Sequence, residues 1–167
     1  MDVSTVSTGG RSAGGKRRSA LLGRALLSGS AASAASALVL LARSRAEAGS
    51  AAAGINAPSH WVHGEPAIRQ RRWTGAHSAL GSAIHHLSSV FWAMAFEALL
   101  ARRPRTPATL AAAGISGVAA LTDLKLVPYR LTPGFQRHLR PASLALVYLA
   151  FGAGLAAAAL CRPSRHS

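Results

Sequence analysis

Residues 74–100 read TGAHSALGSAIHHLSSVFWAMAFEALL, and this stretch decides the fold of the chain. At ~1.5 Å of rise per residue it is long enough to cross a bilayer as a helix. It nevertheless carries His77, His85, His86 and Glu97. Ionisable side chains inside an apolar span are costly, so they mark the stretch as a candidate site as well as a candidate span.

On a helical wheel at ~100° per residue, two faces of this stretch separate. An apolar face suited to lipid consists of Leu80, Ile84, Leu87, Phe91 and Met94. A stripe of small and polar residues consists of Gly75, Ala79, Ser82, His86, Ser89, Ala93 and Glu97. Such a stripe lets neighbouring transmembrane helices approach and hydrogen-bond. His85 lies ~100° further round and is also turned away from the lipid face, so both imidazoles are predicted to point into a bundle.

The composition favours a membrane protein over a water-soluble one. Half of the 167 residues are hydrophobic, 14% are charged and the mean hydropathy is +0.24. The net charge of +14 does not indicate a nucleic-acid partner, because the basic residues fall between apolar runs rather than among aromatic residues. The expected partners are the lipid bilayer and, through exposed helix faces, a homo- or hetero-oligomer. The single cysteine, Cys161, excludes an internal disulfide and a cysteine-based metal site.

Three further apolar runs predict an all-α, four-helix transmembrane bundle. The predicted segments are a disordered basic tail (1–18), a membrane domain (19–162) with spans at about 20–42, 74–100, 106–127 and 141–160, and a short C-terminal tail (163–167). Close-packing edges are predicted in the first span at Gly29, Ser33 and Ala37, and in the last at Ala150, Gly154 and Ala158.

The first apolar run has a second interpretation as a targeting signal. Cleavage would use the sequence Ala46-Glu47-Ala48, and a twin-arginine signal would use Arg17-Arg18. The run is too long for an ordinary signal, and two arginines precede the cleavage position. We therefore expect a retained span.

Orientation is not decided by counting basic residues, because Lys and Arg divide equally between the two sides of the predicted bundle. The compact cluster from Lys16 to Arg18 and the dense turn at Arg102, Arg103 and Arg105 favour cytoplasmic N- and C-termini.

The topology predicts which ionisable residues can meet. The second and third spans are antiparallel, so Asp123 should lie one or two turns shallower than His85 and His86. The loop residue His60 and the span residue His77 belong to the same end of the bundle. Imidazole and carboxylate ligands suit zinc, copper or non-haem iron, and histidine also suits haem, so these five residues form a candidate metal or cofactor site or a proton path. The alternative, which we favour, is that the histidines hydrogen-bond to neighbouring spans and no cofactor is bound.

Three other residues are assigned structural roles. Glu97 is predicted to form an interfacial ion pair with the basic turn at 102–105. Trp61 and Trp73 are predicted to anchor the long first loop in the headgroup region, with a loop hydrogen bond for the His60-Trp61 pair. Signatures of hydrolases, phosphate-binding loops and zinc proteases are missing, so an enzyme is not predicted.

Three motifs carry a resemblance to a known group of proteins. They are Asn-Ala-Pro-Ser-His-Trp at 56–61, Ile-His-His at 84–86 followed by Ser-Val-Phe-Trp-Ala at 89–93 and Glu97, and Asp123 followed by Arg-Leu-Thr-Pro-Gly-Phe at 130–135. Over residues 20–160 the chain resembles a family of small, uncharacterised bacterial integral membrane proteins with four spans. The resemblance implies a bacterial inner-membrane location and transfers no catalytic role. We therefore expect a non-enzymatic multi-pass protein with a structural or accessory role; the alternative is a small transporter or a metal- or haem-binding protein that uses His85, His86 and Asp123.

Overall fold

The computed structural model describes residues 9–162, and side chains from residue 14 onward. Within that range the chain is helical and contains no strand, which confirms the predicted all-α class. Four helical segments are long and apolar enough to cross a membrane. Their helices are α1 (Gly9–Ala48), η2 (Gly75–Ala79) continued by α5 (Leu80–Arg102), α6 (Ala108–Leu121) continued by η3 (Thr122–Leu126), and α7 (Pro141–Leu160).

The predicted starts of the spans agree closely with the structure. Thr74 is the N-cap of the second span, where its hydroxyl accepts a hydrogen bond from the backbone N–H of His77 at 3.2 Å. Pro141 occupies the first turn of α7, where its missing N–H costs nothing. The first helix differs from expectation, because α1 already begins at Gly9 and includes residues 9–18 of the predicted disordered tail. Once the packed part of α1 is helical, each added residue gains a backbone hydrogen bond without a new nucleation cost. Residues 1–8 and 163–167 lie outside the described range.

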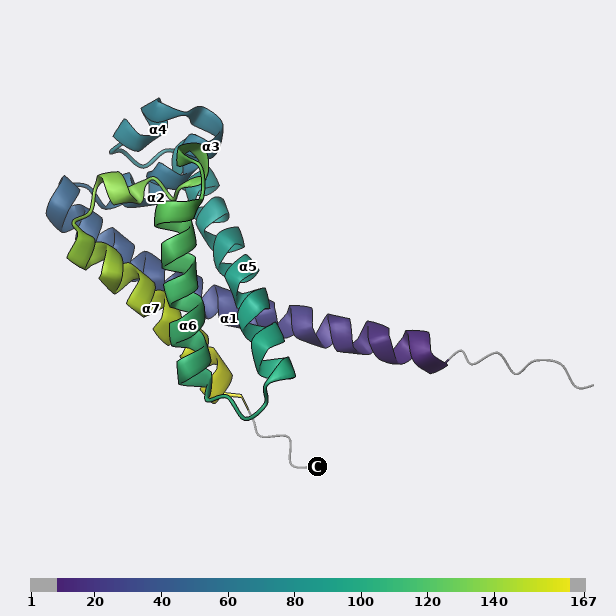
Figure 1. Ribbon diagram of the computed structural model, residues 1–167. Helices are drawn as coiled ribbons and strands as arrows, with labels where there is room; N and C mark the ends of the chain where they lie inside the picture. The colour runs from purple at the N-terminus through teal and green to yellow at the C-terminus, as the bar shows by residue number, and fades with distance from the viewer. Residues whose placement is uncertain (1–8, 163–167) are drawn as a thin grey trace, which may run out of the picture.

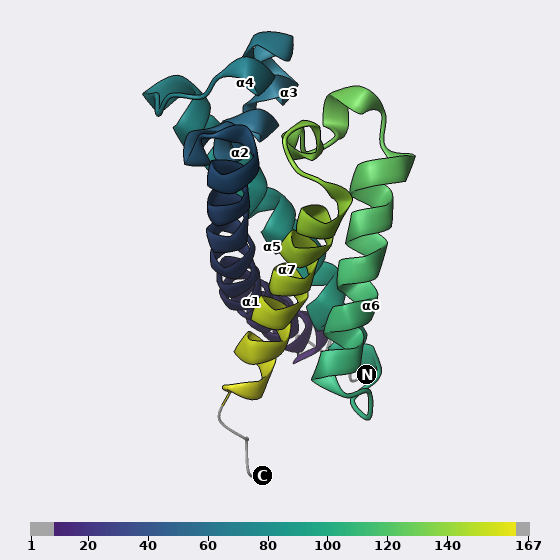
Figure 2. The same ribbon diagram turned by 90° about the vertical axis from the view of Figure 1, so that its left-hand side faces the viewer.

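Helix α7 lies between α1 and α6, and α5 packs against α1 (Figures 1 and 2). Two of the predicted glycines allow the closest approaches between the long helices. A Cβ on Gly154 would lie 2.5 Å from the Cα of Ala32, and a Cβ on Gly29 would lie 2.7 Å from the Cα of Val90. The absence of side chains at these two positions therefore brings α1 into backbone contact with both α7 and α5.

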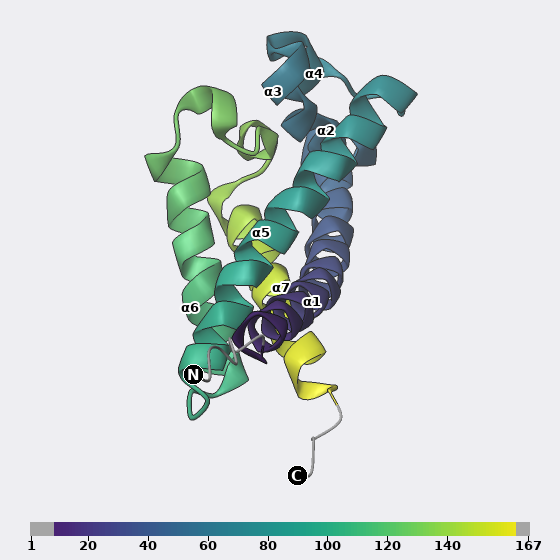
Figure 3. The ribbon, with the colours of Figure 1, turned by 90° about the vertical axis from the view of Figure 1, so that its right-hand side faces the viewer.

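Helices α5 and α6 are joined by a tight turn at 103–107 and diverge toward the opposite end of the molecule (Figure 3). That end is closed by a cap of short helices: α2 (Ala51–Asn56), η1 (Ala57–Ser59), α3 (His60–His63), α4 (Glu65–Arg69), η4 (Tyr129–Leu131) and η5 (Phe135–Arg137). The sequence predicts a loop at 43–73, but residues 52–60 are all buried. The cap sits on α5 at Gly81, where a Cβ would collide with the carbonyl oxygen of Ile55.

The buried face of α5 agrees with the predicted stripe only in its second half. Ser89, Ala93 and Glu97 are buried, whereas Ser82 is exposed and its neighbour Gly81 is buried instead. His85 faces the bundle in this register, and His86 is half-buried beside it. The physical reason is that the cap packs on one side of the start of α5, whereas α1 packs on a different side of its end. A helical wheel of α5 alone cannot show this difference.

The predicted partner of Glu97 is wrong. Its carboxylate is 2% exposed and pairs with Arg162, which follows α7, rather than with the basic turn at 102–105. Arg162 Nη1 donates to Oε2 at 2.8 Å, and the hydroxyl of Ser28 in α1 donates to Oε1 at 2.5 Å. Glu97 faces the interior where α1, α5 and α7 meet, so its partners come from α1 and from the residue that follows the end of α7 rather than from the turn at 102–105.

A second carboxylate joins α1 and α7 at the cap end. Glu47 accepts hydrogen bonds from the hydroxyl of Ser143 at 2.5 Å and from the backbone N–H of Arg140 at 2.7 Å, and it pairs with Arg43 at 2.5 Å. The antiparallel α1–α7 pair is thus fixed at both ends by a buried or half-buried carboxylate, with small residues in contact between them.

Candidate functional site

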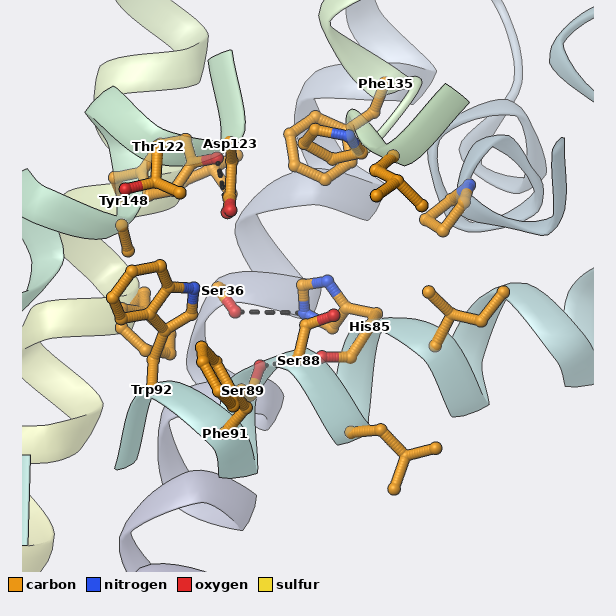
Figure 4. Close-up of a pocket in the computed structure, with 18 of the residues that line it drawn as sticks. Ser36, His85, Ser88, Ser89, Phe91, Trp92, Thr122, Asp123, Phe135 and Tyr148 are labelled. Carbon is orange, nitrogen blue, oxygen red and sulfur yellow. Dashed lines mark hydrogen bonds between the residues drawn. The ribbon is translucent and has the colours of Figure 1, made fainter. Parts of the chain in front are cut away.

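A cavity of about 500 Å³ lies between α5, α6 and α7, beneath the cap (Figure 4). Ser36 of α1 forms part of its lining, and Pro58, Trp61, Leu131, Pro133 and Phe135 of the cap lie at its outer end. Helices α5 and α6 diverge toward the cap (Figure 3), and residues of both helical segments line the cavity. Its volume is within the ~300–1,000 Å³ usual for small-molecule sites.

Aromatic side chains are concentrated around this cavity. Every aromatic side chain in the sequence except Trp73, Phe96 and Tyr129 lines it. Those that do are Trp61, Phe91, Trp92, Phe135, Tyr148 and Phe151. In a chain with 5% aromatic residues, this gathering gives one cavity a mostly apolar wall with several π faces.

His85 is a hydrogen-bonded member of the wall. Its Nε2 lies 3.1 Å from the hydroxyl oxygen of Ser36, and that hydroxyl donates its proton to the carbonyl of Ala32 at 2.8 Å. We assign the ring proton to His85 Nε2, because a Ser36 hydroxyl that donates to Ala32 leaves its oxygen as the acceptor. The neutral ring then has an unprotonated Nδ1, which is an acceptor.

Asp123 stands on the other side of the cavity, in the wide turn η3 that ends the α6 segment (Figure 4). The hydroxyl of Tyr148 in α7 donates to its Oδ2 at 3.1 Å. Among the described residues, no Lys, Arg or His nitrogen lies within 4.0 Å of this carboxyl group. Asp123 is therefore a polar group in an apolar wall without a cation of its own.

The cavity is open along one edge. Leu87, Phe91 and Leu131 belong to its lining and yet are 66%, 58% and 47% exposed. Leu87 and Phe91 lie on the face of α5 that the sequence assigns to lipid. A ligand could therefore enter from the hydrocarbon region of a bilayer.

The structure brings together only two of the five predicted ligand residues. His85 and Asp123 line the cavity, whereas His86, His77 and His60 do not. His77 Nδ1 is 3.1 Å from the hydroxyl of Thr74, and its ring lies 4.8 Å from that of His63, centroid to centroid. His60 is 2% exposed and its Nδ1 bonds to the carbonyl of Ala57 at 2.8 Å. Within the described part of the chain, no three His, Cys, Asp or Glu side chains are grouped as metal ligands.

The two tryptophans with predicted anchoring roles differ in their surroundings. The indole N–H of Trp61 donates to the carbonyl of Thr132 at 2.8 Å, so this residue joins the connection at 43–73 to the connection between the third and fourth spans. Trp73 is 60% exposed at the start of the second span. A position of Trp73 in the headgroup region stays a prediction.

Sequence reasoning missed three members of the site, namely Ser36, Trp92 and Tyr148. Tyr148 had a detectable signal, because it carries the only hydroxyl in the middle of the uncharged run 144–160. A tyrosine hydroxyl inside a span needs a partner, and Asp123 is the partner it has. Ser36 and Trp92 had no such signal, since Ser36 is one of several serines in the first span and Trp92 is one of three aromatic residues in the second.

Comparisons of the chain with protein-family models, with curated proteins and with solved structures found no match. The function is therefore inferred from the cavity and its surroundings.

Proposed function

We propose that the protein is a multi-pass protein of the bacterial inner membrane that binds one lipophilic small molecule in the cavity between α5, α6 and α7. The single observation that carries the proposal is an aromatic-lined cavity of about 500 Å³ with an edge open beside Leu87 and Phe91. Sites for small molecules are mostly apolar with a few polar groups, and this wall has that composition.

Binding without chemistry fits the polar groups of the cavity. His85, Asp123 and Tyr148 come from α5, η3 and α7, and each is hydrogen-bonded to another side chain. Such groups orient a ligand, and the one hydroxyl that contacts the imidazole of His85 in the described wall, that of Ser36, donates to the carbonyl of Ala32 rather than to the ring. An accessory or transport role therefore agrees with the site better than catalysis.

The test uses the fluorescence of the two tryptophans in the wall. In a Trp73→Phe parent, the remaining emission comes from Trp61 and Trp92, and titration with triphenylphosphine oxide in detergent micelles should quench it saturably. Ala119→Phe should abolish the effect, because Ala119 lines the cavity and is 1% exposed.

Val118→Phe is the matched control, since Val118 is 52% exposed on the neighbouring face of α6. If the probe quenches both phenylalanine variants equally, the cavity is not the binding site. If neither this neutral probe nor the charged probes described below quench the emission, the protein does not bind such molecules. Either result would overturn the proposal in favour of a purely structural role.

The expected orientation has both termini in the cytoplasm. The basic side chains near the termini and the α5–α6 turn, which are Lys16, Arg17, Arg18, Arg24, Arg102, Arg103 and Arg105, are exposed. Basic side chains at the cap end, including Arg45, Arg71 and Arg130, are exposed as well, and these three also donate to backbone carbonyls. The orientation therefore rests on the compact clusters at 16–18 and 102–105, because basic residues next to short turns favour the cytoplasmic side. Reporter fusions after Arg105 and after Arg140 test this, and a periplasmic signal from the first would reverse the orientation.

A further inference from the structure

The charge and the hydrogen-bonding groups of the cavity specify its ligand more closely than its shape does. We infer that the cavity takes a lipophilic cation, such as a hydrophobic amine or an aromatic onium ion, with its positive charge beside Asp123 and its apolar groups among the aromatic side chains. This inference rests on the proposed function.

Asp123 differs from the other described carboxylates in its surroundings. Glu47 and Glu97 each have an arginine partner, and Glu65 is exposed and accepts a hydrogen bond from Tyr129. Asp123 has the Tyr148 hydroxyl and the Trp92 indole beside it and no Lys, Arg or His partner among the described residues, although it lies in a helical segment able to span a membrane. A carboxyl group in an apolar wall gains a strong electrostatic interaction when a cation enters, because the low surrounding dielectric weakens the attraction little.

The second polar group of the wall favours the same sign of charge. His85 uses its Nε2–H on Ser36, so it offers the cavity an acceptor at Nδ1 and no N–H. An anionic ligand would find no Lys or Arg side chain in the described wall. The ionisable groups of the wall are therefore one carboxyl group and one imidazole that offers an acceptor, with no Lys or Arg beside them.

The aromatic wall completes the recognition of a cation. The faces of Trp61, Trp92, Tyr148 and the wall phenylalanines carry negative electrostatic potential, which attracts a cation whose charge is spread over apolar groups. Such a cation loses little hydration on leaving water and partitions into the headgroup region of a bilayer. It can then reach the cavity at the open edge beside Leu87 and Phe91.

The decisive experiment compares three phenyl-bearing probes of different charge, of which the two ions are nearly equal in size and the neutral probe is smaller by one phenyl ring. They are the tetraphenylphosphonium cation, neutral triphenylphosphine oxide and the tetraphenylborate anion, each titrated against the emission of Trp61 and Trp92 in the Trp73→Phe parent in a zwitterionic detergent. Tetraphenylphosphonium should bind at least about tenfold more tightly than the neutral probe, which is the affinity ratio given by 1.4 kcal/mol. Tetraphenylborate should bind least.

Two variants assign the charge preference to Asp123. Asp123→Asn should lower the affinity for tetraphenylphosphonium to that for triphenylphosphine oxide and leave the neutral probe unchanged, which also shows that the variant is folded. Asp123→Glu should retain the preference for the cation.

The failures of the two proposals are distinguishable. Saturable, Ala119-dependent binding with the same affinity for all three probes, or an Asp123→Asn variant that loses the cation and the neutral probe equally, overturns the cation inference and leaves the lipophilic site intact. Absence of saturable binding by every probe overturns both.

Discussion

The Glu97–Arg162 pair gives the sharpest test of how the bundle is held together. Replacing Arg162 with Gln leaves a carboxylate whose side chain is 1% exposed with Ser28 as its main remaining partner. Breaking a buried ion pair by removing one partner costs about 3–5 kcal/mol, so the free energy of unfolding of Arg162→Gln should fall by that amount. Glu97→Gln should cost less, about 1–3 kcal/mol, because the Arg162 side chain is 27% exposed and can turn toward water.

The assay is unfolding in mixed micelles by titration with sodium dodecyl sulfate, with helicity as the readout. The double variant Glu97→Met/Arg162→Met should recover most of the loss, to within about 1 kcal/mol of the original protein, because no unpaired charge remains. Arg105→Gln is the matched control, since Arg105 is exposed at the same end of the bundle and should be neutral within about 0.5 kcal/mol. If Arg105→Gln costs as much as Arg162→Gln, or if the single and double variants are equally unstable, the buried pair is not what joins α5 to α7.

Three other predictions concern packing, pH and the cap. Gly154→Leu should destabilise the protein by about 1–3 kcal/mol because its Cβ would meet α1 at 2.5 Å, whereas Gly114→Leu, with no atom within 4 Å of its Cβ, should not; the same micelle titration compares them. Burial lowers the pKa of His138 below the ordinary 6.5, so the unfolded chain takes up a proton at higher pH than the folded one. The thermal midpoint should therefore be constant above about pH 6.5 and fall below it, and His138→Leu should reduce that slope; an unchanged slope would contradict the assignment. Trp61→Phe removes the hydrogen bond to the carbonyl of Thr132 and should speed amide exchange in residues 129–137, measured by mass spectrometry, with exchange in α7 unchanged.

The sequence predicts where two helices approach closely when the approach depends only on the size of the residues. Gly29 and Gly154 lie in four-residue rows of small residues, and these two positions make the backbone contacts of α1 with α5 and α7. The partner of Glu97 could not be predicted from the sequence. The basic turn is near in sequence, but the direction in which the Glu97 side chain points selects Arg162, which follows a different helix.

The candidate site was predicted in part for a similar reason. Antiparallel spans place Asp123 and His85 at the same end of the bundle, with Asp123 one or two turns shallower, and in the structure both line one cavity. His85 rather than His86 lines the cavity because the cap contacts α5 at Gly81, about one turn before His85, and the aromatic side chains of the wall come from the cap and two long helices, α5 and α7.

The sequence by itself determined four apolar helices, their approximate bounds and the positions where small residues permit contact, because these follow from hydropathy and helical periodicity along the chain. Only the tertiary structure decided that residues 74–100 present His85 to a cavity and Glu97 to Arg162, that α5 and α6 diverge, and that the connection at 43–73 folds into a buried cap. The physical reason is that these features depend on which faces of separate helices meet, and the free energy of such contacts is shared between residues far apart in the chain.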